Sequence, residues 1–184
     1  MARVKGTAVR ASLRFLQERF GPTGTGSVLE RLEPGDREMV MSGLLDSVWY
    51  PMPLLLRLMR AATEVHGAAE PELLRKMGRA SAESGVRGVY KVFFKVGSPQ
   101  FIIGRAARVF GSYYDTGEIR VVESGPGRAV LDLTNFEGSR EFCQRIQGWM
   151  ERTMEMAGAK QLVPSHSQCC YEGDPVCRFE GTWD

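Results

Sequence analysis

The sequence has little of what commonly signals a function. It contains two histidines, four cysteines and three tryptophans in 184 residues. Its 24 basic and 22 acidic residues leave a formal net charge of +2, so no charge excess favours binding to nucleic acid or to an anionic membrane. Nothing in it suggests a Ser-His-Asp nucleophile set, a pair of catalytic carboxylates or a dinucleotide-binding glycine fingerprint. We therefore expect a protein that is not an enzyme and that binds no nucleic acid.

Long apolar segments are also lacking. No run reaches the roughly 18 consecutive apolar residues that a membrane-spanning helix needs. Residues 1–6 have no apolar region of the kind found in a signal peptide. We expect no membrane span and a cytoplasmic location. In a reducing compartment, four cysteines concentrated near one end of a chain are typical of metal ligands or buried thiols, and not of a disulfide framework.

The first part of the chain has helical patterns. Apolar residues at helical spacing, with proline and glycine between the runs, predict helices over 6–20, 28–32, 36–45, 54–63, 71–84 and 99–114. A flexible turn is expected over residues 21–26. The run Val89–Val96 can be a strand or a helix, and its apolar residues at i, i+3, i+4 and i+7 favour a helix.

Strand patterns dominate the last third of the chain. Runs rich in β-branched residues, separated by glycine-containing turns, predict strands over 117–123, 128–134, 160–171 and 176–183, with a helix over 139–157 between the second and the third. This order predicts an α+β fold in which N-terminal helices pack on a four-stranded antiparallel sheet. A length of 184 residues with 43% hydrophobic content predicts one domain. Within it, residues 1–66 would be an N-terminal helical segment, and residues 67–184 would be helices plus a ββαββ core.

Four residues of the types that bind zinc have spacings that allow them to meet. Cys143 falls within the predicted helix 139–157. His166 and Cys169 lie three apart in an extended segment, and Cys177 begins the last strand. Three thiolates and one imidazole fill a tetrahedral zinc site and leave no open position. We therefore expect a structural zinc ion that fixes the helix to the hairpin and does not activate water.

The loop between the last two strands decides which cysteine faces Cys177. A three-residue loop pairs Cys169 with Cys177, whereas a four-residue loop pairs Cys170 with Cys177. The sequence alone favours neither register. Such a pair can be a buried apolar contact, a disulfide or half of a metal site, and the addition of His166 and Cys143 favours the metal site.

At these residues the chain resembles the V4R (4-vinyl reductase) ligand-binding domains, which include sensor domains of aromatic-responsive bacterial transcription activators. In that family the zinc ligands are a helical Cys, an acidic residue three before a second Cys, and a third Cys eight residues further on. Cys143, Cys169 and Cys177 match the three thiolates, and His166 replaces the carboxylate. Zinc accepts this replacement because imidazole nitrogen also serves in tetrahedral sites. The resemblance covers roughly the second half of the chain.

The N-terminal half is similar to a narrower group. Val4–Arg10 and Val48–Pro53 resemble a myxobacterial paralogous family, related to V4R domains and to the Bet3 subunit type of vesicle-tethering complexes, in the nitric-oxide-signalling and Golgi-transport superfamily. Distant relatives of this fold sense nitric oxide through haem. The Tyr-x-Ser-x-Arg pattern of those haem proteins is absent here, which disfavours haem. A third hypothesis, an enzyme that acts on a tetrapyrrole vinyl group, is supported by the family name alone.

The V4R resemblance implies a non-catalytic sensor or binding domain that holds a small apolar molecule between the helices and the sheet. The residues expected to line that site are Tyr90, Phe93, Phe94, Phe101, Ile102, Phe110 and Trp149. The same side chains also suit a filled core. The alternative function is a dimeric protein-interaction or scaffold module without a ligand, as the Bet3 resemblance implies.

A homodimer is expected in either case. Two-fold dimers are the commonest soluble assembly, and related domains of the resembled fold pair through their N-terminal helices. The apolar stripe of Leu13, Leu16 and Phe20 is the candidate surface for this pairing.

Overall fold

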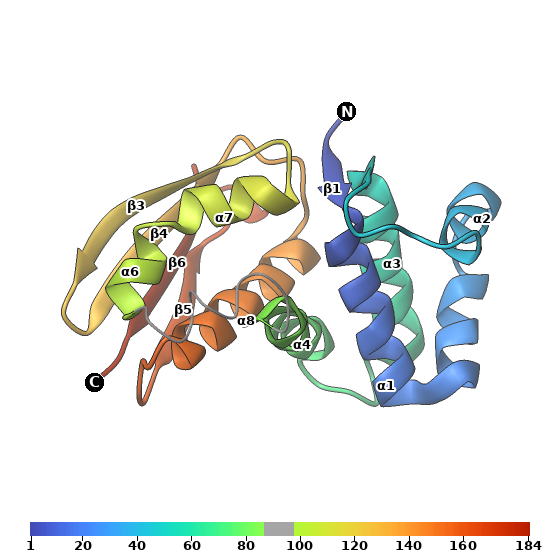
Figure 1. Ribbon diagram of the computed structural model, residues 1–184, viewed down its shortest axis with the longest axis horizontal. Helices are drawn as coiled ribbons and strands as arrows, with labels where there is room; N and C mark the ends of the chain where they lie inside the picture. The colour runs from blue at the N-terminus through green and yellow to red at the C-terminus, as the bar shows by residue number, and fades with distance from the viewer. Residues whose placement is uncertain (87–97) are drawn as a thin grey trace.

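The N-terminal half of the protein is helical, and the main sheet is in the C-terminal half (Figure 1). The computed structural model describes residues 1–86 and 98–184. The helices are α1 (Gly6–Glu30), α2 (Pro34–Met41), α3 (Met52–His66), α4 (Leu73–Val86), α6 (Pro99–Ile103), α7 (Ala106–Tyr113), α8 (Arg140–Met156) and the short 3-10 helix η1 (Cys170–Glu172). The strands are β1 (Arg3–Lys5), β2 (Trp49–Pro51), β3 (Glu118–Gly125), β4 (Arg128–Thr134), β5 (Val163–Gln168) and β6 (Cys177–Thr182). The helix expected over 89–96 lies outside the described residues.

The main sheet has the strand order β3-β4-β6-β5, and all neighbouring strands are antiparallel. Leu133 on β4 is paired with Cys177 on β6, and both are buried with Phe179 under the helices. Side chains alternate along a strand, so the next residues point to the other face, where Arg178 donates two hydrogen bonds to Asp132 at 2.7 and 2.8 Å. This contact lowers the pKa of Asp132. The predicted α+β class with a four-stranded antiparallel sheet is confirmed. Among the described elements, the helices that pack mainly on this sheet are α6, α7 and α8, and not the N-terminal helices that the sequence predicted.

Helix α1 contains a sharp turn where a flexible loop was predicted. Its first segment follows the expected helix 6–20. Gly21 then has a φ of 67°, in the left-handed region that favours glycine. Pro22 begins a second helical segment that continues to Glu30, because a proline in a first turn sacrifices no amide hydrogen bond. The loop prediction was wrong here, since the break is a kink between two helical segments.

A small second sheet closes the N-terminal part of the fold. Strand β1 pairs with β2, so that Arg3 lies opposite Pro51. Val4, at the centre of β1, is fully buried and also forms a bridge with Tyr114, at the end of α7. The sequence did not predict these strands, because three residues are too few to show an alternating pattern.

Helices α4 and α8 join the two halves, and they touch backbone to backbone. A Cβ atom added at Gly78 of α4 would lie 1.9 Å from the carbonyl oxygen of Arg145. One added at Gly148 of α8 would lie 2.0 Å from the carbonyl oxygen of Arg75. Ion pairs extend the contact, with Arg75 2.9 Å from the buried Glu151. The two glycines therefore set the close approach of these helices and so the position of α8.

The apolar stripe proposed as a dimer surface is used within the chain. Leu16 is fully buried in the core, and Leu13 and Phe20 pack against that core. Phe20 also stacks on His66, with ring centroids 3.8 Å apart. Leu16 therefore cannot contribute to a surface between two copies, and the homodimer itself stays a prediction.

The helix expected over 99–114 is interrupted. Helix α6 ends at Ile103 and α7 begins at Ala106, so that two short helices follow the face of the sheet (Figure 1). In the part of the chain that the structure describes, no helix has the length and apolar character needed to span a bilayer.

Candidate functional site

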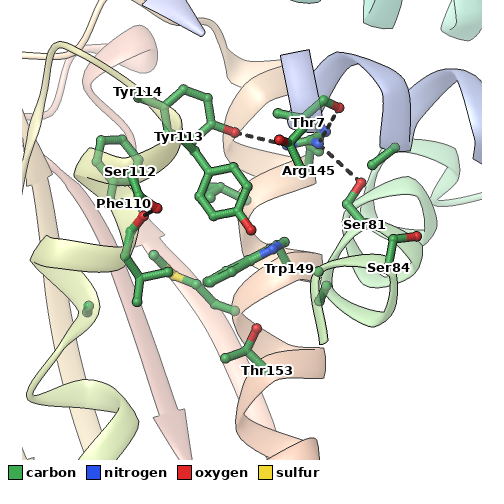
Figure 2. A pocket seen from close by; sticks show the side chains of 18 of the residues that line it. Thr7, Ser81, Ser84, Phe110, Ser112, Tyr113, Tyr114, Arg145, Trp149 and Thr153 are labelled. Carbon is green, nitrogen blue, oxygen red and sulfur yellow. Dashed lines mark hydrogen bonds between the residues drawn. The ribbon is translucent and has the colours of Figure 1, made fainter. Parts of the chain in front are cut away.

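A cavity of about 290 Å³ lies between α1, α4, α6, α7 and α8, and Ile119 of β3 and Leu131 of β4 also line it. Figure 2 shows part of its wall. Its volume is close to the lower end of the range for small-molecule sites, about 300–1,000 Å³. The larger apolar side chains of its wall are Ile102, Val109, Phe110, Tyr113, Ile146, Trp149, Met150 and Met154. An apolar wall with a few polar groups is typical of a site for an organic molecule.

Helix α8 supplies the longest side of this wall. It begins where the Ser139 side chain accepts a hydrogen bond from the Phe142 amide at 3.3 Å, a typical N-terminal cap. Residues three and four apart then share one face, which turns Ile146, Trp149 and Met150 toward the cavity. The amphipathic pattern of this helix thus positions the site.

Arg145 is the most deeply buried polar group of the cavity wall, with 1% of its surface exposed. Figure 2 shows its guanidinium group between Tyr114 and Ser81. It donates to the Tyr114 hydroxyl at 3.1 Å and to the Ser81 hydroxyl at 3.1 Å. It also donates to Ser12 Oγ and to the Ala8 carbonyl oxygen, both at 3.3 Å. All four acceptors are neutral.

Thr153 is a second polar group on the same face of α8. Its side chain borders the cavity and is 3% exposed. Within the described ranges, its Oγ1 atom is buried and has no hydrogen-bond partner. A buried hydroxyl without a partner costs free energy, so the folded protein gains if a bound molecule supplies one.

A second candidate site lies where α8 meets the last hairpin. One ligand atom from each of Cys143, His166, Cys169 and Cys177 lies within 4.8 Å of the others. The three cysteines are buried, and the sulfur atoms of Cys143 and Cys177 are 3.5 Å apart. The His166 ring stacks on Phe179 at 4.6 Å, and its Nε2 atom is buried without a hydrogen-bond partner among the described residues. These residue types at these distances can hold a metal ion.

The contacts within the cluster also give its thiols different pKa values. The hydrogen bond from Cys143 lowers the pKa of Cys177 to about 4. The same hydrogen bond, together with burial, raises the pKa of Cys143, and burial raises the pKa of Cys169. The cluster therefore favours one thiolate, on Cys177, held by a neighbouring thiol.

The hairpin loop is longer than either sequence alternative. Gln168 pairs with Arg178 after a bulge in β5, and continuing this register would set Cys169 opposite Cys177. The chain then forms η1 and passes Gly173, which has a φ of 105°. Cys170 is exposed, yet its sulfur reaches to 3.1 Å from that of Cys177. Partial burial of this thiol and its contact with Cys177 raise its pKa to about 11.

Three of the seven residues expected to contact a ligand line the cavity: Ile102, Phe110 and Trp149. Phe101 is not part of the wall, and its ring lies under the guanidinium group of Arg105, 3.5 Å away. Tyr90, Phe93 and Phe94 lie outside the described residues.

Comparison with solved structures identifies the fold as that of H-NOX proteins. An H-NOX protein from S. oneidensis, in the Fe(II)NO ligation state, matches with a TM-score of 0.75 and 14% identity over 98% of this chain and 99% of that chain. A point mutant of the H-NOX protein from K. algicida, in the unliganded Fe(II) state, gives a TM-score of 0.73 and 13% identity over 98% and 96% of the two chains. The IWP-051-bound H-NOX from Shewanella woodyi gives a TM-score of 0.67 and 17% identity over 97% and 94%.

No family model matches the sequence, and a search of curated proteins found no match. At identities of this level the likeness shows the fold alone. It nevertheless overturns the V4R and Bet3 assignment, because the matched structures are H-NOX proteins. The V4R resemblance rested on the helix that contains Cys143 and on the hairpin that contains Cys169 and Cys177. These two elements do not determine how the other helices are arranged around the sheet.

The expected zinc cofactor is likewise overturned, because the matched structures are those of haem proteins. Whether haem fits this chain depends on its iron ligand. The chain has only two histidines. The Nε2 atom of His66 lies 3.0 Å from the Gly24 carbonyl oxygen, outside the cavity. His166 belongs to the cysteine cluster, also outside the cavity. A histidine-ligated haem does not fit these residues.

Sequence reasoning missed Arg145 and Thr153. Both lie on the face of α8 that includes Trp149, four residues from it in each direction. A charged residue on the apolar face of an amphipathic helix departs from the usual pattern, and this departure was the available signal. Residues that approach from other elements, such as Ser81 and Tyr114, have no comparable signal in the sequence.

Proposed function

We propose that the protein is a non-catalytic small-molecule-binding domain of the sensor type, in which an organic ligand occupies the cavity beside α8. The observation that carries this proposal is the cavity of about 290 Å³ with its apolar wall. The matched H-NOX structures include one with NO on iron and one with IWP-051 bound, which supports a ligand-binding role for this fold. Because neither histidine lines the cavity, the ligand here binds directly to the protein, without an iron ligand from histidine.

A fluorescent neutral probe, N-phenyl-1-naphthylamine, tests this proposal. We expect its fluorescence to rise on titration with the full-length protein and the rise to saturate. Ala106 lines the cavity and Ala107 does not, so Ala106→Trp should weaken probe binding at least tenfold. The matched control Ala107→Trp, on an exposed residue, should leave binding unchanged. Absence of probe binding to the wild-type protein would overturn the proposal in favour of an interaction module without a ligand.

A second experiment tests the exclusion of histidine-ligated haem. Haemin added to the protein, then reduced and exposed to carbon monoxide, should not give the absorption spectrum of a histidine-ligated ferrous haem. Such a spectrum, if it disappeared in His66→Ala or His166→Ala, would contradict the interpretation of the cavity.

We also propose that Cys143, His166, Cys169 and Cys177 are metal-ligating residues, and we assign no particular ion to them. The distances within the cluster and the unpartnered Nε2 atom of His166 support this role. For an ion that takes only four ligands, these side chains would leave no coordination position for a substrate, and its role would be structural. Elemental analysis of protein purified without added metal tests it. A metal content well below one ion per chain would contradict it.

A further inference from the structure

The positive charge of Arg145 is buried in the cavity wall without a counter-ion. A guanidinium group has five N–H donors. Its four hydrogen bonds use the single Nε hydrogen, both Nη2 hydrogens and one Nη1 hydrogen. One Nη1 hydrogen is therefore without a partner among the described residues. No ion pair of Arg145 with a carboxylate is found in residues 1–86 and 98–184 either.

The rest of the chain offers no hidden counter-ion. Asp46 is the one acidic residue among the described residues that line the cavity. It pairs with Arg10 at 3.1 Å, and its side chain is 63% exposed. Residues 87–97 contain no aspartate or glutamate. Buried charges in proteins are normally paired, because removing a charge from water costs several kcal/mol. The exception at Arg145 therefore calls for an anion from outside the chain.

The exposed charges that border the cavity are mostly positive. Arg14, Arg105 and Arg108 are exposed there, whereas the one acidic residue among the described residues of the wall, Asp46, is paired with Arg10. A net positive charge around a cleft raises the local concentration of anionic ligands. An anion would therefore be drawn to the opening and stabilised inside it.

We propose that the ligand of this cavity is an amphipathic organic anion, whose carboxylate pairs with Arg145 and whose apolar body lies against Trp149. This inference rests on the proposed ligand-binding function and names its ligand class. Four of the five donors of the guanidinium fork are already used, so one carboxylate oxygen would accept the remaining Nη1 hydrogen. A hydrogen bond between two charged groups is stronger than one between neutral groups. Arg145 and Thr153 are eight residues apart on α8, about 12 Å along the helix axis. The apolar body therefore spans a length comparable to a ten-carbon chain.

Decanoate and decan-1-ol provide a matched pair of probes, because they share the chain length and differ in the charge of the head group. Each displaces N-phenyl-1-naphthylamine from the full-length protein if it enters the cavity. We expect decanoate to bind at least tenfold more tightly than decan-1-ol to the wild-type protein. Equal affinity of the two probes, or tighter binding of the alcohol, would overturn the anion proposal while leaving the ligand-binding function intact. Failure of the neutral fluorescent probe to bind would instead overturn the function.

Variants of Arg145 test whether the anion binds at this residue. Arg145→Met should abolish the preference for decanoate, so that the ratio of the two affinities falls to about one. Arg145→Lys should retain part of the preference, because the charge stays but the fork is lost. Arg140→Met is the matched control, since Arg140 is an exposed residue of the same helix outside the cavity. A preference for decanoate that survives Arg145→Met would show that the anion binds elsewhere. If Arg145→Met does not fold, Arg145→Lys decides the position of the anion, and a preference for decanoate equal to that of wild type would contradict pairing with the guanidinium group.

Discussion

The cavity and the cysteine–histidine cluster both depend on α8, but their buried polar groups are arranged differently. In the cluster, three buried sulfur atoms and an imidazole lie within 4.8 Å of one another. In the cavity, the buried charge of Arg145 has only neutral partners, and the hydroxyl of Thr153 has none among the described residues. In the cluster the side chains, including the unpartnered Nε2 atom of His166, converge on one point, which suits a bound ion. Unsatisfied buried groups around an open space suit the binding of a larger organic ligand.

The comparison predicts that a change in the position of α8 damages both regions at once. Gly148→Ala places a Cβ atom 2.0 Å from the backbone of Arg75, so the helices must separate. We expect the free energy of unfolding to fall by about 3 kcal/mol or more, with loss of both probe binding and the cluster. Gly111→Ala in α7 is the matched control, because its Cβ atom meets no atom of the described residues within 4 Å. Urea denaturation checks both. An effect of Gly148→Ala no larger than that of the control would contradict the backbone contact.

The second prediction separates the two regions. Cys177→Ser removes the sulfur that contacts Cys143 at 3.5 Å and Cys170 at 3.1 Å. A buried hydroxyl in its place has poorer partners, so we expect a loss of about 1–3 kcal/mol and loss of any bound metal. Probe binding by the folded fraction should stay as in wild type. The measurements are urea denaturation, elemental analysis and fluorescence titration. A parallel loss of probe binding, at concentrations where the variant is folded, would show that the regions are coupled.

How much the sequence predicts differs between these regions for a physical reason. The four residues of the cluster share recognisable chemistry, and the strand alternation together with the helix position was enough to bring them near one another. The cavity depends on the relative position of five helices and the sheet. That arrangement depends on close contacts such as that of Gly78 with the backbone of Arg145, which have no periodic signature.

The elements of the fold also divide into those that the sequence predicted and those that it did not. The helix over 139–157 and the strands over 117–134 were predicted within a few residues, because their periodic patterns are long. The kink at Gly21 and the interruption of the helix at Gly104 were not predicted, since each depends on a single residue. The family assignment was wrong because it rested on local matches, around Cys143 and Cys177 in the second half and at Val4–Arg10 and Val48–Pro53 in the first half, and these do not define the arrangement of the helices around the sheet. The single-domain organisation and the cytoplasmic location stay predictions.

The third prediction tests the unsatisfied hydroxyl of the cavity. Thr153→Val replaces the buried Oγ1 atom by a methyl group of similar size. Removing a polar atom without a partner should raise the free energy of unfolding of the ligand-free protein by up to about 1 kcal/mol. Urea denaturation measures this, and Thr63→Val is the control, because Thr63 Oγ1 donates to the Met59 carbonyl oxygen at 3.0 Å. A loss of stability in Thr153→Val as large as that in the control would indicate that the hydroxyl has a partner.

The smallest effect is expected at the edge of the cluster. Cys170 is exposed and is not one of the four residues whose ligand atoms converge, although its sulfur contacts that of Cys177 at 3.1 Å. Because a surface substitution seldom changes stability by more than about 0.5 kcal/mol, Cys170→Ser should leave the free energy of unfolding within that range. It should also leave metal content and probe binding as in wild type. Urea denaturation beside Cys177→Ser gives the most direct comparison, since the two variants remove the two ends of one sulfur contact. Equal destabilisation by both would mean that the contact itself, and not the buried position of Cys177, stabilises the hairpin, and the cluster would then have to include Cys170.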